Sequence, residues 1–208
     1  MKRILCYGDS NTWGYNPRTQ ERYPKSQRWT GILKEELGEE YEIIEEGLNG
    51  RTTVWEDPIE GHKNGKEYLI PCLESHRPID LVVLMLGSND LKKRFSLSAY
   101  DIAQGAGVLL DVIQKSASGA AEDVPQILLM APPPVGKLTE FAEEFEEAEE
   151  KSRKFSSHYR QVAEEYGCEF LDTSKVIVSS DIDGIHLEPD EHQKLGKTVA
   201  ALARKTLG

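Results

Sequence analysis

Four short segments, far apart in the chain, contain residue types that could support nucleophilic catalysis. They are GDS at 8–10, GLNGRTT at 47–53, GSND at 87–90 and DGIH at 183–186. A serine hydroxyl is a weak nucleophile at its ordinary pKa, so Ser10 needs a neighbouring base that a third group orients. Taken alone, GDS is typical of a helix cap and DGIH of a solvated turn. Taken together, the segments supply a hydroxyl, an imidazole, carboxylates and an amide, and they predict a serine that a neighbouring base activates as a nucleophile.

Among the five histidines, His186 is the best candidate for the base. Asp183 precedes it by three residues with Gly184 between them, so the chain can fold back and its carboxylate can accept the Nδ1 proton. Nε2 then faces Ser10. His192 is the second choice, because it lies within a predicted helix and lacks such a partner. The remaining three are expected to be ordinary surface or hydrogen-bonded residues: His62, His76 and His158.

Strands and helices that alternate along the chain must position these segments. Apolar runs of strand length and amphipathic segments of helix length alternate, which predicts βαβ units and a three-layer α/β/α sandwich with five parallel strands. The middle strand is apolar throughout, as expected when helices cover both faces of a sheet. The strands are expected at 3–7, 41–46, 80–87, 126–131 and 168–172, and the helices at 26–37, 98–117, 140–166 and 188–207.

A flavodoxin-like strand order, 2-1-3-4-5, would bring the segments together. In this order the crevice lies at the carboxyl ends of strands 1 and 3, so Ser10 and Asn89 are expected to share one cleft, with 47–53 at its rim. Asp9 is expected to accept local backbone hydrogen bonds, and Asp90 is expected to cap the segment after the third strand.

The whole chain sets limits on its partners. Its 208 residues predict one domain over 1–208 with one sizeable core. The net charge of −11 argues against binding to nucleic acid or anionic membranes. We expect a cytoplasmic protein, because no apolar run is long enough to span a membrane, no signal peptide is recognisable, and three scattered cysteines do not suggest disulfides.

The four segments, in this order, resemble the SGNH hydrolases, also called the GDSL esterase and lipase family. The family's four blocks contribute a serine, a glycine, an asparagine and a histidine, which here are Ser10, Gly50, Asn89 and His186. The resemblance covers nearly the whole chain. It is strongest to a cytosolic arylesterase and acyltransferase branch, on the evidence of RWTGIL at 28–33, EEGLNGRTT at 45–53 and LGSND at 86–90.

The resemblance implies a serine esterase that cleaves small acyl or aryl esters through an acyl-serine intermediate and that can transfer the acyl group to alcohols. It implies Ser10, Asp183 and His186 as the catalytic residues. It also implies an oxyanion hole formed by the backbone N–H groups of Ser10 and Gly50 and the side-chain amide of Asn89. No cofactor or metal is expected, the partner is a small-molecule ester, and relatives suggest a homo-oligomer.

Substrate choice is less well defined. Asn11 stands where the family name has leucine and, with Trp13, is predicted to contact substrate. A carbohydrate O-acetylesterase and a lysophospholipase or thioesterase of the same family remain alternatives. A metal-dependent phosphoesterase is disfavoured, because the clustered ligands of such enzymes are missing from the sequence. A flavodoxin-like small-ligand binding module is the non-enzymatic alternative, although the sequence has no glycine-rich phosphate-binding motif.

Overall fold

Five parallel strands form one central sheet in the order β2-β1-β3-β4-β5. The computed structural model describes the backbone of residues 1–208 and every side chain except that of residue 122. The predicted strand order and the α/β/α architecture are confirmed. The strands are β1 (Lys2–Gly8), β2 (Tyr41–Gly47), β3 (Leu81–Met85), β4 (Gln126–Ala131) and β5 (Glu169–Asp172).

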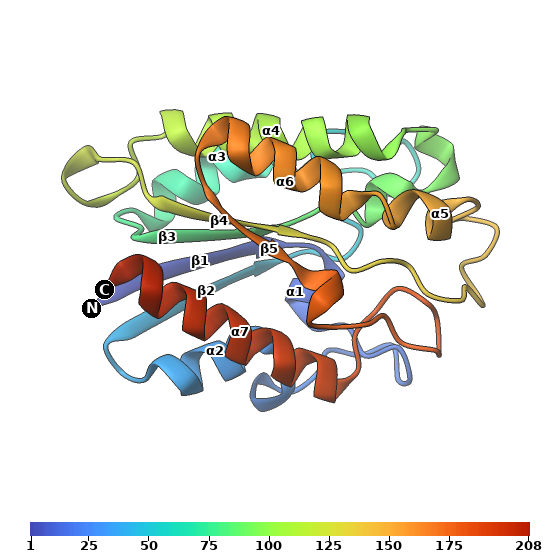
Figure 1. Ribbon diagram of the computed structural model, residues 1–208, viewed down its shortest axis with the longest axis horizontal. Coiled ribbons are helices and arrows are strands. Elements are labelled where there is room, and N and C mark those ends of the chain that lie inside the picture. Colours follow the sequence, from blue (N-terminus) through green and yellow to red (C-terminus); the bar gives the residue numbers. More distant parts are fainter.

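Helices cover both faces of this sheet (Figure 1). The first face carries α3 (Gly65–His76), α4 (Ala99–Lys115) and α6 (Phe155–Tyr166), and the second carries α2 (Trp29–Leu37) and α7 (Pro189–Leu207). Two short helices, α1 (Ser10–Trp13) and α5 (Ala148–Ser152), lie at the carboxyl end of the sheet. Single turns of 3-10 helix occur at Lys25–Gln27, Asn89–Leu91, Lys93–Phe95, Ala120–Glu122 and Thr173–Lys175.

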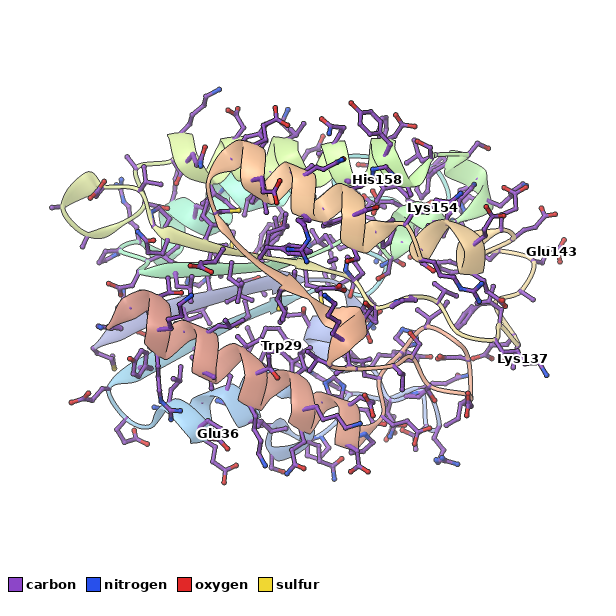
Figure 2. The ribbon with its side chains drawn as sticks, viewed as in Figure 1. Trp29, Glu36, Lys137, Glu143, Lys154 and His158 are labelled. Carbon is purple, nitrogen blue, oxygen red and sulfur yellow. The ribbon has the colours of Figure 1, made fainter. Side chains whose placement is uncertain are left out.

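Alternation along the strands divides the apolar side chains between two cores. Leu5 and Tyr7 of β1 pack under α3, α4 and α6, while Ile4 and Cys6 pack with α2 and α7. All five residues of β3 are buried, which explains why this strand is apolar throughout. Trp29 fills the second core between the sheet and α7 (Figure 2). Helices therefore pack against both faces of the sheet, and the loops lie at its carboxyl edge.

Residues 140–166 are not the single long helix that their spacing predicted. Residues 141–147 form turns that end at Glu147, which has a φ of 70°, so the helix begins only at α5. A second break, at Arg153 and Lys154, separates α5 from α6. The reason lies in another loop: the backbone N–H of Lys93 donates to the carbonyl of Glu144 at 2.7 Å, and the Lys93 ammonium pairs with Glu147 at 2.8 Å. These contacts hold 141–147 over the carboxyl edge of the sheet.

The chain ends lie together at the opposite edge of the sheet (Figure 1). The Lys2 ammonium donates to the carbonyl of Gly208 at 2.9 Å. Among the helices that the structure describes, none is both long enough and apolar enough to cross a bilayer.

Candidate active site

Ser10 lies where β1 ends and the chain turns into α1. Asp9 caps this helix, because its Oδ1 accepts the backbone N–H of Asn11 at 2.9 Å, as the sequence predicted for Asp9. A Cβ on Gly8 would come within 2.1 Å of Thr12 Oγ1, so only glycine allows this turn. Ser10 is the first residue of α1, where backbone N–H groups have no acceptor within the helix.

A hydrogen-bonded chain joins Ser10 to a turn 176 residues away. His186 Nε2 lies 2.9 Å from Ser10 Oγ, and His186 Nδ1 lies 2.6 Å from Asp183 Oδ2. An ionised carboxylate can only accept, so the proton is on Nδ1, and Nε2 accepts the serine O–H. Asp183 is fully buried, whereas Ser10 and His186 retain 6% and 7% exposure. The serine and the imidazole thus remain open to a small ligand.

The turn that carries His186 is fixed by its own backbone. Asp183 Oδ1 accepts the N–H groups of Ile185 and His186, both at 2.9 Å. Gly184 has a φ of 82°, and a Cβ there would lie 2.7 Å from the carbonyl oxygen of Lys137. The glycine between the acid and the base is therefore required by both backbone conformation and space.

The pKa of Asp183 is lowered even though the residue is buried. Burial alone would raise this pKa, but the hydrogen bond from His186, the attraction to that imidazole when it is protonated and the two backbone N–H groups outweigh burial. Asp183 therefore stays ionised and can stabilise a proton on His186. His192 behaves differently: burial lowers its pKa to about 3, and its Nδ1 accepts the N–H of Trp29 at 3.3 Å, so it is a neutral core residue.

Gly50 and Asn89 reach the same cavity from two other loops. Gly50 has a φ of 79°, a conformation that favours glycine. Asn89 Nδ2 donates to the carbonyl of Arg51 at 3.1 Å. This bond uses one amide hydrogen and leaves the other for the cavity. The structure thus brings all five predicted catalytic and oxyanion residues to one place.

The sequence predicted that Asp90 caps the segment after β3, but its carboxylate instead binds another loop. Both of its carboxylate oxygens accept the backbone N–H of Thr53, at 3.0 and 3.1 Å, and its Oδ1 also accepts the Thr53 hydroxyl at 2.5 Å. Burial raises the pKa of Asp90 to about 7, against the lowering effect of the hydrogen bonds from Thr53, and the nearby charge of Asp9 adds to the rise. Burial likewise raises the pKa of Asp9 to about 6.

The cavity above Ser10 has a volume of about 140 Å³. Its lining combines apolar side chains with polar and charged ones. The ring of Tyr15 lies 4.1 Å from that of His186, centroid to centroid. The lining residues are Ser10, Tyr15, Asn49, Gly50, Glu60, Asn89, Lys92, Phe141, Glu144, Phe145, Ile185 and His186.

Ion pairs between three loops form the charged part of the cavity lining. The ammonium of Lys92, only 4% exposed, pairs with Glu60 and lies 3.6 Å from Glu144. Arg94 pairs with the same Glu144 and binds the buried Asp57 at 2.9 Å. No sequence pattern predicts this cluster, since charged loop residues usually face solvent.

The two residues predicted to contact substrate lie elsewhere. Asn11 is buried, and its side-chain amide donates to the carbonyl of Ile185 at 3.3 Å, which links α1 to the turn of His186. Trp13 packs under the guanidinium of Arg22, 5.3 Å from the ring centre. Among the side chains that the structure describes, neither lines the cavity.

A second group of side chains has the composition of a metal site. Glu46, Cys72 and His76 place one potential ligand atom each within 4.8 Å of one another. His76 Nε2 lies 3.0 Å from Glu46 Oε1, and the guanidinium of Arg51 lies over the nearby ring of Tyr68. The hydrogen bond accounts for the pairing of Glu46 with His76, and the guanidinium of Arg51 already places a positive charge near these residues.

Comparison with known proteins gives a consistent result. Residues 6–194 match the GDSL-like Lipase/Acylhydrolase family. A carbohydrate acetylesterase from Sinorhizobium meliloti shares 39% identity, with a TM-score of 0.95 and 99% of each chain covered. The aryl esterase of M. smegmatis shares 39% identity, with a TM-score of 0.96 and both chains fully covered.

Two further relatives differ in how much of this chain they match. A putative arylesterase from Agrobacterium tumefaciens str. C58 is 35% identical, with a TM-score of 0.93 over 100% of both chains. A 50-residue stretch, 24% of this chain, is 40% identical to the uncharacterized lipoprotein YqeF of Bacillus subtilis (strain 168) and covers only 20% of that protein. The full-length similarity is thus to esterases.

Proposed function

This chain belongs to the GDSL-like lipase/acylhydrolase family, and from that premise we propose that it is a serine esterase with Ser10 as nucleophile. His186 is the general base, and Asp183 orients it. The observation that carries the proposal is the hydrogen-bonded chain from Ser10 through His186 to Asp183, at 2.9 and 2.6 Å. These three groups have the contacts that acyl transfer to serine requires.

The reaction begins when Ser10 Oγ attacks the ester carbonyl carbon. His186 Nε2 takes the hydroxyl proton and then donates it to the departing alcohol oxygen, which leaves an acyl group on Ser10. Water next attacks this acyl-serine, and the same Nε2 takes the water proton and returns it to Ser10 Oγ as the carboxylic acid departs. Asp183 keeps the imidazole in the correct tautomer and stabilises its positive charge in both steps.

Negative charge develops on the carbonyl oxygen in each step, so hydrogen-bond donors must point at this oxygen. The backbone N–H groups of Ser10 and Gly50 and the side-chain amide of Asn89 supply them. All three residues border the cavity beside the nucleophile. Such donors act mainly on the transition state, so they raise kcat more than they lower KM.

The acyl group is short. The cavity volume of about 140 Å³ is well below the roughly 300–1,000 Å³ of pockets that hold drug-sized ligands. It accommodates an acetyl group and part of an alcohol more readily than a long chain. This size argues against a lysophospholipase or a long-chain thioesterase.

A carbohydrate O-acetylesterase is the second candidate. Asn49, Glu60, Lys92 and Glu144 form a wall of donors and acceptors at the cavity, which suits an alcohol that carries several hydroxyl groups. The relative from Sinorhizobium meliloti is described as a carbohydrate acetylesterase. Tyr15 and Phe141, which also line the cavity, would instead suit an aromatic alcohol.

A substrate panel tests these proposals. We expect p-nitrophenyl acetate to be cleaved with a higher kcat/KM than the butyrate and octanoate esters, and Ser10→Ala to abolish all three activities. A higher kcat/KM for acetylated monosaccharides than for aryl acetates would favour the second candidate. Preference for octanoate would contradict the assignment of a short acyl pocket, and activity in Ser10→Ala would contradict the serine mechanism.

Acyl transfer to alcohols is a further proposed activity. The rings of Tyr15 and Phe141 lie 4.1 and 6.2 Å from the imidazole of His186, so an apolar alcohol can bind beside the acyl-serine. Added alcohol should then yield the new ester in place of part of the acid. Product analysis that finds only acid at high alcohol concentration would reject this activity.

A further inference from the structure

Two of the proposed oxyanion donors, Gly50 and Asn89, come from different loops, and a buried pair of residues joins these loops. Thr53 lies three residues after Gly50, and Asp90 directly follows Asn89. Thr53 donates both its backbone N–H and its hydroxyl to the Asp90 carboxylate, at 2.5 to 3.1 Å. Both residues are fully buried, at 0% exposure. The bond from Asn89 Nδ2 to the carbonyl of Arg51 is a second link between the loops.

The position of Thr53 is itself closely defined. A Cβ on Gly105 of α4 would lie 2.4 Å from Thr53 Oγ1, so the glycine makes room for this hydroxyl. A Cβ on Gly87, at the start of the Asn89 turn, would lie 2.1 Å from the hydroxyl of Tyr159, and that hydroxyl donates to the carbonyl of Leu86 at 2.7 Å. Helix α4 thus leaves space for the Thr53 hydroxyl, and α6 anchors the chain just before the turn that carries Asn89 and Asp90.

A buried carboxylate is a costly way to join two loops. Well-packed apolar side chains of the same volume often stabilise a fold as much or more. Asp90 faces neutral threonine donors, and its raised pKa reflects that cost. A directional contact, however, fixes the distance and angle between the loops, which apolar packing does less sharply.

We propose that Asp90 and Thr53 are positioning residues that set the separation between the Gly50 N–H and the Asn89 side-chain amide, and so control how well the site stabilises the oxyanion. This inference rests on the proposed esterase function. Neither residue contacts the reacting atoms; both act through Gly50 and Asn89.

The test compares Thr53→Val with its neighbour. Thr53→Val keeps the shape of the side chain and removes the hydroxyl donor. We expect kcat for p-nitrophenyl acetate to fall by about 10- to 100-fold with KM changed by less than about twofold, since small displacements of catalytic groups have effects of this size. Thr53→Ser, which restores the hydroxyl, should recover most of kcat.

Thr52→Val is the matched control. It removes a buried hydroxyl from the same loop, but that hydroxyl donates to the carbonyls of Trp55 and Lys63 and not to Asp90. We expect its kcat to stay close to the parent value, because the contact between Thr53 and Asp90 that joins the two loops is left intact. An equal fall in kcat in Thr52→Val, or in Thr53→Ser, would overturn the proposal, because loop stability or packing would then explain the loss.

A double-mutant cycle separates positioning from general destabilisation. If Thr53 acts through the Asn89 amide, Thr53→Val should reduce kcat much less in an Asn89→Ala background than in the parent. Full additivity would overturn the proposal. Should Thr53→Val fail to fold, Asp90→Asn serves in the same cycle, with the same two outcomes.

Ser10→Ala, measured alongside, distinguishes this inference from the proposed function. If Ser10→Ala is inactive and Thr53→Val has the parent kcat, only the positioning role fails. If Ser10→Ala keeps its activity, the esterase mechanism itself fails.

Discussion

The two halves of the site are built in different ways. Ser10, His186 and Asp183 touch one another directly in a chain of hydrogen bonds. Gly50 and Asn89 instead border a shared cavity, and their positions depend on neighbours such as Asp90. Proton transfer needs contact between the groups involved, whereas an oxyanion hole needs donors arranged around a vacant position. The information that places the proposed oxyanion donors therefore lies in residues outside the hole.

The two buried carboxylates of these halves show the difference most clearly. Asp183 and Asp90 are both fully buried, but the pKa of Asp183 is lowered and that of Asp90 is raised to about 7. Asp183 faces an imidazole that becomes positively charged in the proposed reaction. Asp90 faces the uncharged donors of Thr53, with the carboxyl of Asp9 nearby. We infer that the negative charge of Asp183 stabilises a proton on His186, whereas Asp90 contributes the geometry of its hydrogen bonds to Thr53.

The largest expected effect comes from Asp183→Asn. The amide can hold His186 in the wrong tautomer, so kcat for p-nitrophenyl acetate should fall by about 10⁴-fold. The unfolding midpoint, followed by circular dichroism, checks that the variant is folded. A folded variant with a loss of less than about tenfold would show that contact within the first half of the site matters less than we infer.

Asn89→Ala tests the second half and should have a smaller effect. Loss of one oxyanion donor lowers kcat by about 100- to 1,000-fold, with KM nearly unchanged. Asn64→Ala is the control, because Asn64 caps α3 by accepting the backbone N–H of Lys66 at 3.0 Å, away from the cavity. Parent-like turnover in Asn89→Ala would remove Asn89 from the oxyanion hole.

The pH dependence of stability sharpens the contrast between the carboxylates. In the unfolded chain Asp90 titrates near pH 4, and in the folded chain near pH 7. Between these values the folded protein holds a proton that the unfolded chain has released. The free energy of unfolding therefore falls as the pH rises, by up to about 1.4 kcal/mol per pH unit from this group.

Asp90→Asn removes this contribution. Urea unfolding at several pH values should show the variant gaining stability relative to the parent as the pH rises from about 4 to 7. Asp183→Asn should show the opposite trend at lower pH, because a lowered pKa contributes stability that is lost as the pH falls. A difference in stability between Asp90→Asn and the parent that does not vary with pH would contradict the raised pKa.

The smallest effect is expected at Trp13. Its ring packs against Arg22, whereas the ring of Tyr15 borders the cavity. Trp13→Phe should change kcat/KM by about twofold or less, and Tyr15→Ala should raise KM more strongly. Kinetics on p-nitrophenyl acetate compare the two variants. A larger effect at Trp13 than at Tyr15 would support the sequence-based prediction that Trp13 contacts substrate.

The sequence predicted the parts of the molecule that depend on local pattern. β3 is apolar because it is buried on both faces, and the turn at 183–186 carries its acid, glycine and base within four residues. The sheet order then follows from general rules for α/β folds, so the meeting of Ser10 and His186 could be anticipated.

Features that depend on a distant partner could not be predicted. Asp90 binds Thr53, 37 residues away, and Asn11 binds the carbonyl of Ile185, 174 residues away. The break at Glu147 reflects an ion pair with Lys93 from another loop, although the spacing of Phe141 and Phe145 fits a continuing helix. In each case a tertiary contact overrides a local preference, and it does so near the cavity.

Labelling with a fluorophosphonate tests the central claim most directly, because the probe reacts with a serine only where a base and an oxyanion hole converge on it. Mass spectrometry of the intact protein and of its peptides should find one adduct, on Ser10, which forms far more slowly in Asp183→Asn and Asn89→Ala. An adduct on another serine, or no adduct on the folded parent protein, would contradict the account.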